Sequence, residues 1–240
     1  MFVVSESSLG TDERAWLSTP AVTDAPEMDW GAPGKLVVLS PHPDDETLAV
    51  GGTLAMLARR GFTIEVVAVT DGEGSHPRSP TTSPRDLAIR RAGEQRDAIG
   101  ALGIVPMHRL GIADGAVAKA DLAARIAPLV RGARLVLAPW ASDGHPDHDA
   151  VGRAALACDA RVVPYLVWAW HWARPGSSDL PWARLRRSVL DEEARAAKAR
   201  AIACFGSQIA PLSASPGDER VLPPAVLSRF ARPFETVLAP

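Results

Sequence analysis

Residues 35–46 have the sequence KLVVLSPHPDDE, an apolar run that ends directly in one imidazole and three carboxylates. The apolar part is typical of a buried strand, and open α/β sheets bind their ligands at the carboxyl ends of their strands. A second cluster, HPDH over residues 145–148, follows the apolar run LVLA over residues 135–138 in the same way. Two His/Asp clusters at the ends of two strands can converge on one metal ion. The sequence therefore predicts a metal-dependent hydrolase.

Composition narrows the possible partners. The net charge of −2, with Lys and Arg spread along the chain, gives no electrostatic reason to expect nucleic acid or an anionic membrane as a partner. Two isolated cysteines are too few for a disulfide framework and are typical of a reducing compartment. We find no secretory leader and no apolar run long enough for a membrane span. We therefore expect a cytoplasmic protein and leave its oligomeric state open.

The hydrophobic pattern alternates between strands and helices, which predicts an α/β fold. We expect an N-terminal arm over residues 1–34 and a single domain over residues 35–240, built on a doubly wound, mostly parallel, Rossmann-like sheet of about five strands with helices on both faces. The predicted strands are 35–40, 63–70, 108–110, 134–138 and 161–170, and the predicted helices are 46–60, 83–102, 121–131 and 149–157. A C-terminal α+β extension adds a strand at 184–190, a helix at 191–205 and a final strand at 234–238.

The two clusters supply a complete set of metal ligands. His42, Asp45 and His148 form a His₂Asp set, and a catalytic zinc site uses three protein ligands and leaves one position for water. We therefore predict Zn²⁺ as the cofactor, with Fe²⁺ or another divalent ion as the alternative, since such sites accept several metals. Gly51 and Gly52 fall inside a predicted helix, so we expect no nucleotide cofactor.

Two further side chains of the clusters are suited to acid–base chemistry. Asp44 is not needed as a ligand and can act as the general base that takes a proton from water. His145 can stabilise an oxyanion or protonate a leaving amine. Glu46 stands at a helix start, where it either favours the helix dipole or supports a metal ligand. These groups together are what amide hydrolysis requires.

The two clusters resemble the signature pair of the PIG-L/LmbE-like deacetylases. Weaker similarities to that family are TDGE at 70–73, RAGE at 91–94, LGIADG at 110–115 and SQ at 207–208. The resemblance implies a hydrolase that removes an acetyl or other acyl group from an N-acetylglucosamine-type sugar or glycoconjugate. It also implies that Arg91 and Asp114 contact the sugar. The mycothiol branch of the family has a Tyr where this chain has Asp143, so we expect a substrate other than the mycothiol precursor.

Alternatives remain open at this point. The substrate could be another N-acylated amine, or the chain could be a non-catalytic protein that binds metal or sugar. Trp168, Trp170 and Trp172 alternate as they would on one face of a strand, and they fit either sugar stacking or core packing. His76 lies in a Gly/Pro-rich loop where a lid would be useful. The sequence does not decide between these interpretations.

Overall fold

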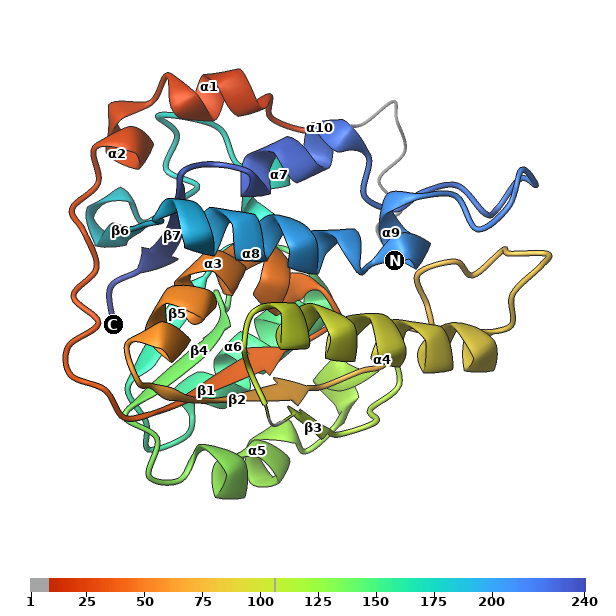
Figure 1. The fold of residues 1–240 in the computed structure, drawn as a ribbon, viewed down its shortest axis with the longest axis horizontal. Helices are drawn as coiled ribbons and strands as arrows, with labels where there is room; N and C mark the ends of the chain where they lie inside the picture. The colour runs from red at the N-terminus through yellow and green to blue at the C-terminus, as the bar shows by residue number, and fades with distance from the viewer. Residues whose placement is uncertain (1–8, 106) are drawn as a thin grey trace.

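The protein is built on a seven-stranded sheet. In a computed structural model, which describes residues 9–105 and 107–240, the strand order is β3-β2-β1-β4-β5-β7-β6 (Figure 1). The first five strands in this order are parallel, whereas β7 and β6 are antiparallel to their neighbours. The strands are β1 (Lys35–Ser40), β2 (Thr63–Ala68), β3 (Met107–Arg109), β4 (Leu135–Pro139), β5 (Val162–Tyr165), β6 (Leu185–Val189) and β7 (Phe234–Leu238). The predicted doubly wound, mostly parallel sheet is confirmed, and the C-terminal extension adds two strands to it.

Helices cover both faces of the sheet, and β1 shows how the sequence specifies this. Leu36 and Val38 of β1 point into one hydrophobic core, and Val37 and Leu39 point into the other. All four side chains are fully buried, which explains why this strand is a continuous apolar run rather than an alternating one. The helices are α3 (Asp45–Arg59), α4 (Pro84–Ala101) and α8 (Glu192–Ala203) on the first face, and α5 (Leu122–Val130) and α6 (Pro146–Leu156) on the second (Figure 1).

The order in which strands are added to the sheet changes side at β1. From β1 the chain proceeds to β2 on one side, and later returns to place β4 on the other side. The carboxyl ends of β1 and β4 therefore border the switch point of the sheet, which is where open α/β sheets form their binding crevice. The two His/Asp clusters follow these two strands, so the topology brings them to one place.

The helix ends agree with the local sequence. Ser83 accepts a hydrogen bond from the backbone N–H of Asp86, Pro84 occupies the first turn, and Gly103 ends α4 with a φ of 77°. Asp191 caps α8 by accepting from the backbone N–H of Ala194. These starts and stops are confirmed within a residue or two.

The fifth predicted strand is partly wrong. β5 ends at Tyr165, and residues 169–172 form the short helix α7 (Ala169–Trp172). The chain leaves the sheet because the carboxylate of Asp143 accepts the backbone N–H groups of Val167, Trp168 and Ala169. The tryptophans therefore do not alternate on a strand face.

The helix predicted over residues 149–157 starts three residues earlier than expected. Pro146 begins α6, and His145 is its N-cap. Proline is favoured at the first helical position because its missing N–H has no partner there in any case. His148 consequently projects from the first turn of a helix and not from a loop.

The described part of the N-terminal arm packs on the domain and follows the sheet edge at β6 (Figure 1). Trp16 is fully buried, with its ring edge-on to Trp170 at a centroid distance of 5.1 Å. Glu27 forms a parallel bridge with Arg187 of β6. The first eight residues of the predicted arm lie outside the described residues. The shorter helices are α1 (Glu13–Leu17), α2 (Pro20–Thr23), α9 (Gly206–Ile209), α10 (Pro224–Leu227) and the 3₁₀ turns η1 (Val117–Lys119), η2 (Trp182–Arg184) and η3 (Ser228–Phe230).

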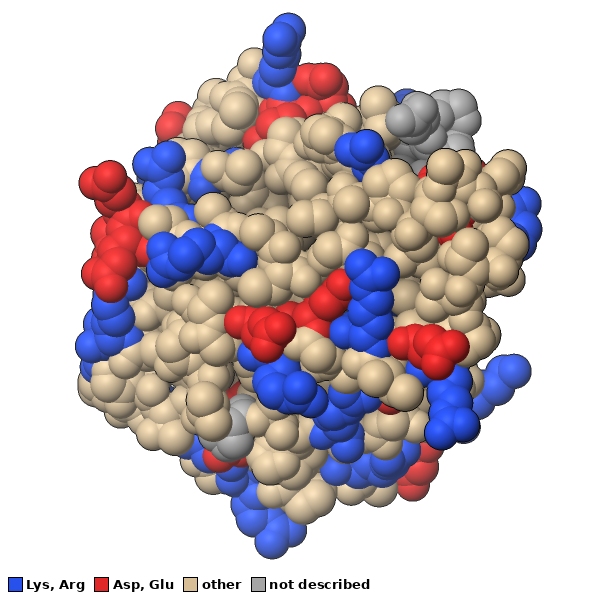
Figure 2. Space-filling model, turned by 45° about the vertical axis from the view of Figure 1, so that its right-hand side comes forward, with Lys and Arg blue, Asp and Glu red and all other residues tan. Residues whose placement is uncertain are grey.

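The face in Figure 2 carries charges of both signs, with Asp and Glu side chains alternating with Lys and Arg across its middle. Such mixing weakens the long-range field over this face. Within residues 9–105 and 107–240, no helix combines the length and the apolar character that crossing a bilayer requires.

A buried ion pair ties the C-terminal strand to two helices. Lys198 of α8 lies 2.7 Å from Glu235 of β7, which also accepts the backbone N–H groups of Gly52 and Thr53 in α3. Both charged side chains are almost fully buried. Lys198→Met would leave the Glu235 carboxylate buried without its counter-ion, so we expect the free energy of unfolding to fall by about 3–5 kcal/mol. Urea unfolding measures this, with Lys119→Met as the surface control. A loss below about 1 kcal/mol would contradict the assigned role of the pair.

Candidate active site

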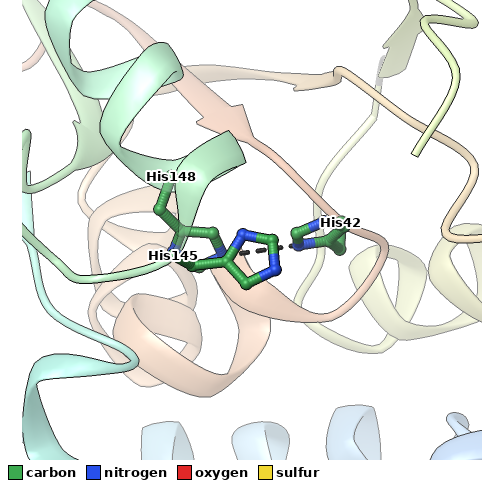
Figure 3. Close-up of side chains that lie close together, drawn as sticks. All are labelled: His42, His145 and His148. Atoms are coloured by element: carbon green, nitrogen blue, oxygen red, sulfur yellow. Dashed lines mark hydrogen bonds between the residues drawn. The ribbon is translucent and has the colours of Figure 1, made fainter. Parts of the chain in front are cut away.

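The three predicted ligands meet at the switch point. His42 lies in the loop after β1, Asp45 is the first residue of α3, and His148 lies in the first turn of α6. The Oδ2 atom of Asp45 is 3.1 Å from His42 Nδ1 and 3.1 Å from His148 Nε2. The two nitrogens are themselves 3.3 Å apart, and Figure 3 shows the rings directed toward each other.

These separations fit a metal ion. Four ligand atoms arranged tetrahedrally at zinc bond lengths of about 2.0–2.1 Å are about 3.3 Å from one another. The observed donor spacings agree with this value, and two imidazoles with one carboxylate are donors that zinc accepts. The residues present therefore fit a zinc ion.

Asp143 orients His148, although no sequence motif places it at the site. Its fully buried carboxylate lies 2.9 Å from His148 Nδ1, and it also accepts three backbone N–H groups. The carboxylate stabilises a proton on Nδ1, so Nε2 is the nitrogen that would bind a metal ion. Burial lowers the pKa of His148, but Asp45 and Asp143 outweigh it and raise the pKa to about 9. The only signal in the sequence was an acidic residue two positions before His145.

Asp143→Asn is expected to weaken zinc binding about 10- to 100-fold, because the amide keeps the shape of the side chain but not its charge. Competition with a chromogenic chelator measures the affinity, and Asp159→Asn on the surface is the matched control. Equal affinities of Asp143→Asn and the unaltered protein would show that Asp143 only supports the backbone.

The other nitrogen of His42 faces two carboxylates. Its Nε2 atom is 3.3 Å from Asp114 and 3.5 Å from Asp147, and these three side chains form a second group close enough to bind an ion. The same is true of His42, His145 and His148. We favour the His42–Asp45–His148 set, because the carboxylates at Nε2 stabilise a proton there and leave Nδ1 as the acceptor. Burial lowers the pKa of His42, but the hydrogen bonds to Asp114, Asp147 and Asp45 raise it well above its ordinary value.

Asp44 lies directly beside the three ligands and is buried. Its carboxylate pairs with Arg91 at 2.9 Å, and Arg91 also donates to the carbonyl oxygens of Gly72 and Pro43. Burial raises the pKa of Asp44 to about 7, although the nearby Arg91 lowers it. Among the described residues Asp44 is also the one non-glycine with a positive φ, at 158°. A strained, buried carboxylate with this pKa is suited to accept a proton.

The predicted sugar contacts, Arg91 and Asp114, are both engaged within the protein. Arg91 is 3% exposed and forms an ion pair with Asp44. Asp114 accepts the backbone N–H of Gly74 and faces His42. Both side chains also line the pocket, where a substrate could touch them. Their contact with the sugar stays a prediction.

His145 borders the centre from the N-cap of α6. Its Nδ1 atom accepts the backbone N–H of Asp147, so the proton of the neutral ring lies on Nε2. The ring stacks on Trp168 at a centroid distance of 5.7 Å. Burial and the positive rings of His42 and His148 lower the pKa of His145 to about 4. The neutral ring can donate a hydrogen bond from Nε2, and the predicted role of His145 as oxyanion donor or acid stays a prediction.

Glu46 supports the loop and not a metal ligand directly. It accepts a hydrogen bond from Gln95, and it shares the one hydroxyl proton of Ser40 with the backbone oxygen of His42. Burial raises the pKa of Glu46. Tyr165 is fully buried and donates to the backbone oxygen of Leu39, away from the pocket.

Of the three tryptophans and His76, Trp168 alone lines the pocket, together with His171. Trp170 is buried in the core, and Trp172 lies partly exposed, with its indole N–H bonded to the backbone of Asp143. His76 lies outside the pocket wall and bonds to the backbone oxygen of Glu219.

A family model described as "PIG-L: GlcNAc-PI de-N-acetylase" matches residues 37–158, which include both His/Asp clusters and half of the chain. The chain belongs to the PIG-L family. The match begins in β1 and ends just after α6, so it covers all three proposed ligands as well as Asp44 and His145.

The individual relatives share about 30% of their residues with this chain, over part of its length. A diacetylchitobiose deacetylase of Thermococcus kodakarensis is 30% identical over 49% of this chain and 46% of its own. A 1D-myo-inositol 2-acetamido-2-deoxy-alpha-D-glucopyranoside deacetylase of Streptomyces avermitilis is 31% identical over 66% of this chain and 64% of its own. The first curated relatives are matched over 46%, 61% and 50% of their length, so the chain spans about half of them.

A solved structure resembles the fold over most of its length. The A40926 pseudoaglycone deacetylase superimposes with a TM-score of 0.61 and 26% identity, over 85% of this chain and 96% of that one. The similarity therefore extends beyond the PIG-L match into the C-terminal third.

Proposed function

We propose that this chain is a metal-dependent hydrolase that removes the N-acyl group from an N-acetylglucosamine-type sugar or glycoconjugate. The observation that carries the proposal is the buried carboxylate of Asp44 beside a convergent set of three ligand atoms. A protein that only binds metal or sugar needs the ligands but not this additional proton acceptor. Membership of the PIG-L family and the names of the relatives support the same chemistry.

His42, Asp45 and His148 would hold the metal ion, for which zinc is the first candidate and ferrous iron the alternative. The chemistry supplied there would be that of a Lewis acid, which polarises an amide carbonyl and makes water more acidic. Proton transfer and stabilisation of the developing negative charge are carried out by the protein's own side chains.

Asp44 takes a proton from the attacking water and later returns it to the leaving nitrogen. Arg91 holds the Asp44 carboxylate in place through their ion pair at 2.9 Å. As the amide carbon becomes tetrahedral, its oxygen gains negative charge, and the Nε2–H of His145 donates to it. The products are a free amine and a carboxylic acid, with one water molecule consumed.

The proposal is tested by measuring free amine and acetate released from a panel of N-acetylglucosamine derivatives. Metal-stripped protein is compared with the same protein after zinc or ferrous iron is restored. We expect release only from the metal-loaded protein. Absence of release from every derivative and from other N-acylated amines, with metal bound, would contradict a hydrolytic role.

A further inference from the structure

The pocket above the candidate centre has an unexpectedly apolar side. Besides Trp168 and the polar side chains, the lining includes five aliphatic side chains and one phenyl ring. We call these six the apolar wall: Leu48, Val167, Val221, Leu222, Val226 and Phe230. None of the six belongs to the two His/Asp clusters. An amino sugar surrounded by hydroxyl groups does not by itself require such a surface.

The wall is continuous with the centre and is held in place. Leu48 lies one helical turn after Asp44, and the backbone N–H of Val167 bonds to Asp143. Val221 and Leu222 both donate their backbone N–H groups to the carbonyl oxygen of Gln208. These contacts fix the wall relative to the point where an amide carbon has to lie.

The polar side chains near the wall are already bonded within the protein. Gln208 donates to Ser75 and Ser207, and His171 faces the Arg229 guanidinium. Arg229 also donates to the backbone oxygens of Thr11 and Leu9. A sugar hydroxyl buried here would have to compete with these bonds.

An N-acylated sugar carries two groups on its amide, the hydroxylated ring on nitrogen and the hydrocarbon group on the carbonyl carbon. The wall suits only the second. An acetyl group offers the wall a single methyl group, whereas a longer hydrocarbon chain can contact several of its six side chains.

We propose that the apolar wall receives the hydrocarbon chain of the acyl group, so that this protein prefers medium-length N-acyl sugars to N-acetyl sugars. This inference rests on the proposed hydrolytic function of the same site. Each methylene moved from water onto the wall strengthens binding about three- to fourfold. The preference should therefore increase with chain length until the wall is filled.

The test uses the full, zinc-loaded chain with glucosamine carrying acetyl, butanoyl, hexanoyl or octanoyl groups. A second arm keeps the acetyl group and adds an octyl chain to the anomeric oxygen. We expect kcat/KM to rise about three- to fourfold per methylene in the first arm only. A rise in the second arm alone would assign the wall to the aglycone and overturn the inference, as would no rise in either arm.

Variants of the wall connect the effect to these residues. Val221 and Leu222 are partly exposed, so Val221→Asn with Leu222→Gln should fold. The double variant is expected to flatten the dependence on chain length, whereas Ile89→Gln, at a 65% exposed position on α4, should leave it unchanged. A slope that survives the double variant would contradict the assignment.

A binding measurement separates this inference from the hydrolytic proposal. Calorimetry compares octanoate with acetate, which are the acid products of two members of the series. We expect octanoate to bind at least tenfold more tightly, and equal affinities would overturn the role of the wall. Tighter octanoate binding without cleavage of any amide would leave the wall standing and refute only the hydrolytic function.

Discussion

Replacing Asp44 with Asn is expected to lower kcat for amide hydrolysis about 100- to 10,000-fold, the range that general-base catalysis contributes. The amide can still accept a hydrogen bond from Arg91, so the loop and the three ligands should keep their places. Bound zinc per protein should therefore stay close to that of the unaltered chain. This separation of activity from metal content is specific to a proton acceptor.

The measurement pairs amine release with metal analysis on the same preparation. Asp97→Asn, an exposed carboxylate on α4, is the control for a lost negative charge and should behave like the unaltered protein. If Asp44→Asn loses metal and activity in the same proportion, Asp44 is a ligand and not a base.

His148→Ala should remove metal binding and activity together. His148 is fully buried and supplies one of the three converging donor atoms, and alanine has no atom to replace it. We expect zinc affinity to fall by more than the roughly 10- to 100-fold expected when only the hydrogen-bond partner of a ligand is altered. Hydrolysis should then fall to the level of the metal-stripped protein.

Chelator competition and amine release measure the two effects, and circular dichroism checks that the variant is folded. His108→Ala removes a histidine from the edge strand β3, at a partly exposed position, and serves as the control. If folded His148→Ala still binds zinc, the metal lies on the Nε2 side of His42, with Asp114 and Asp147, and the proposed ligand set is wrong.

Most of the fold was predictable because local signals and the global topology agree. Continuous apolar runs specified β1 and β4, and caps such as Ser83 and Asp191 marked helix starts. The fifth strand was not predictable in full. Its apolar and aromatic residues continue past Tyr165, but Asp143, more than 20 residues earlier, withdraws the backbone from the sheet.

The candidate site was predictable where the chemistry lies in short motifs. His42, Asp45 and His148 converge because two strand ends adjoin, which follows from the topology. The supporting contacts were not predictable, because they join residues far apart in the sequence. Arg91 reaches Asp44 across 47 positions, and the apolar wall is completed by α10 and η3 in the last third of the chain.

Anomalous X-ray scattering at the zinc absorption edge, from crystals of zinc-loaded protein, tests the central claim most directly. The claim is that the metal lies on the Nδ1 side of His42. We predict a single strong peak about 2.0–2.2 Å from His42 Nδ1, His148 Nε2 and an Asp45 carboxylate oxygen. A peak on the other side of the ring, between His42 Nε2, Asp114 and Asp147, would contradict the account.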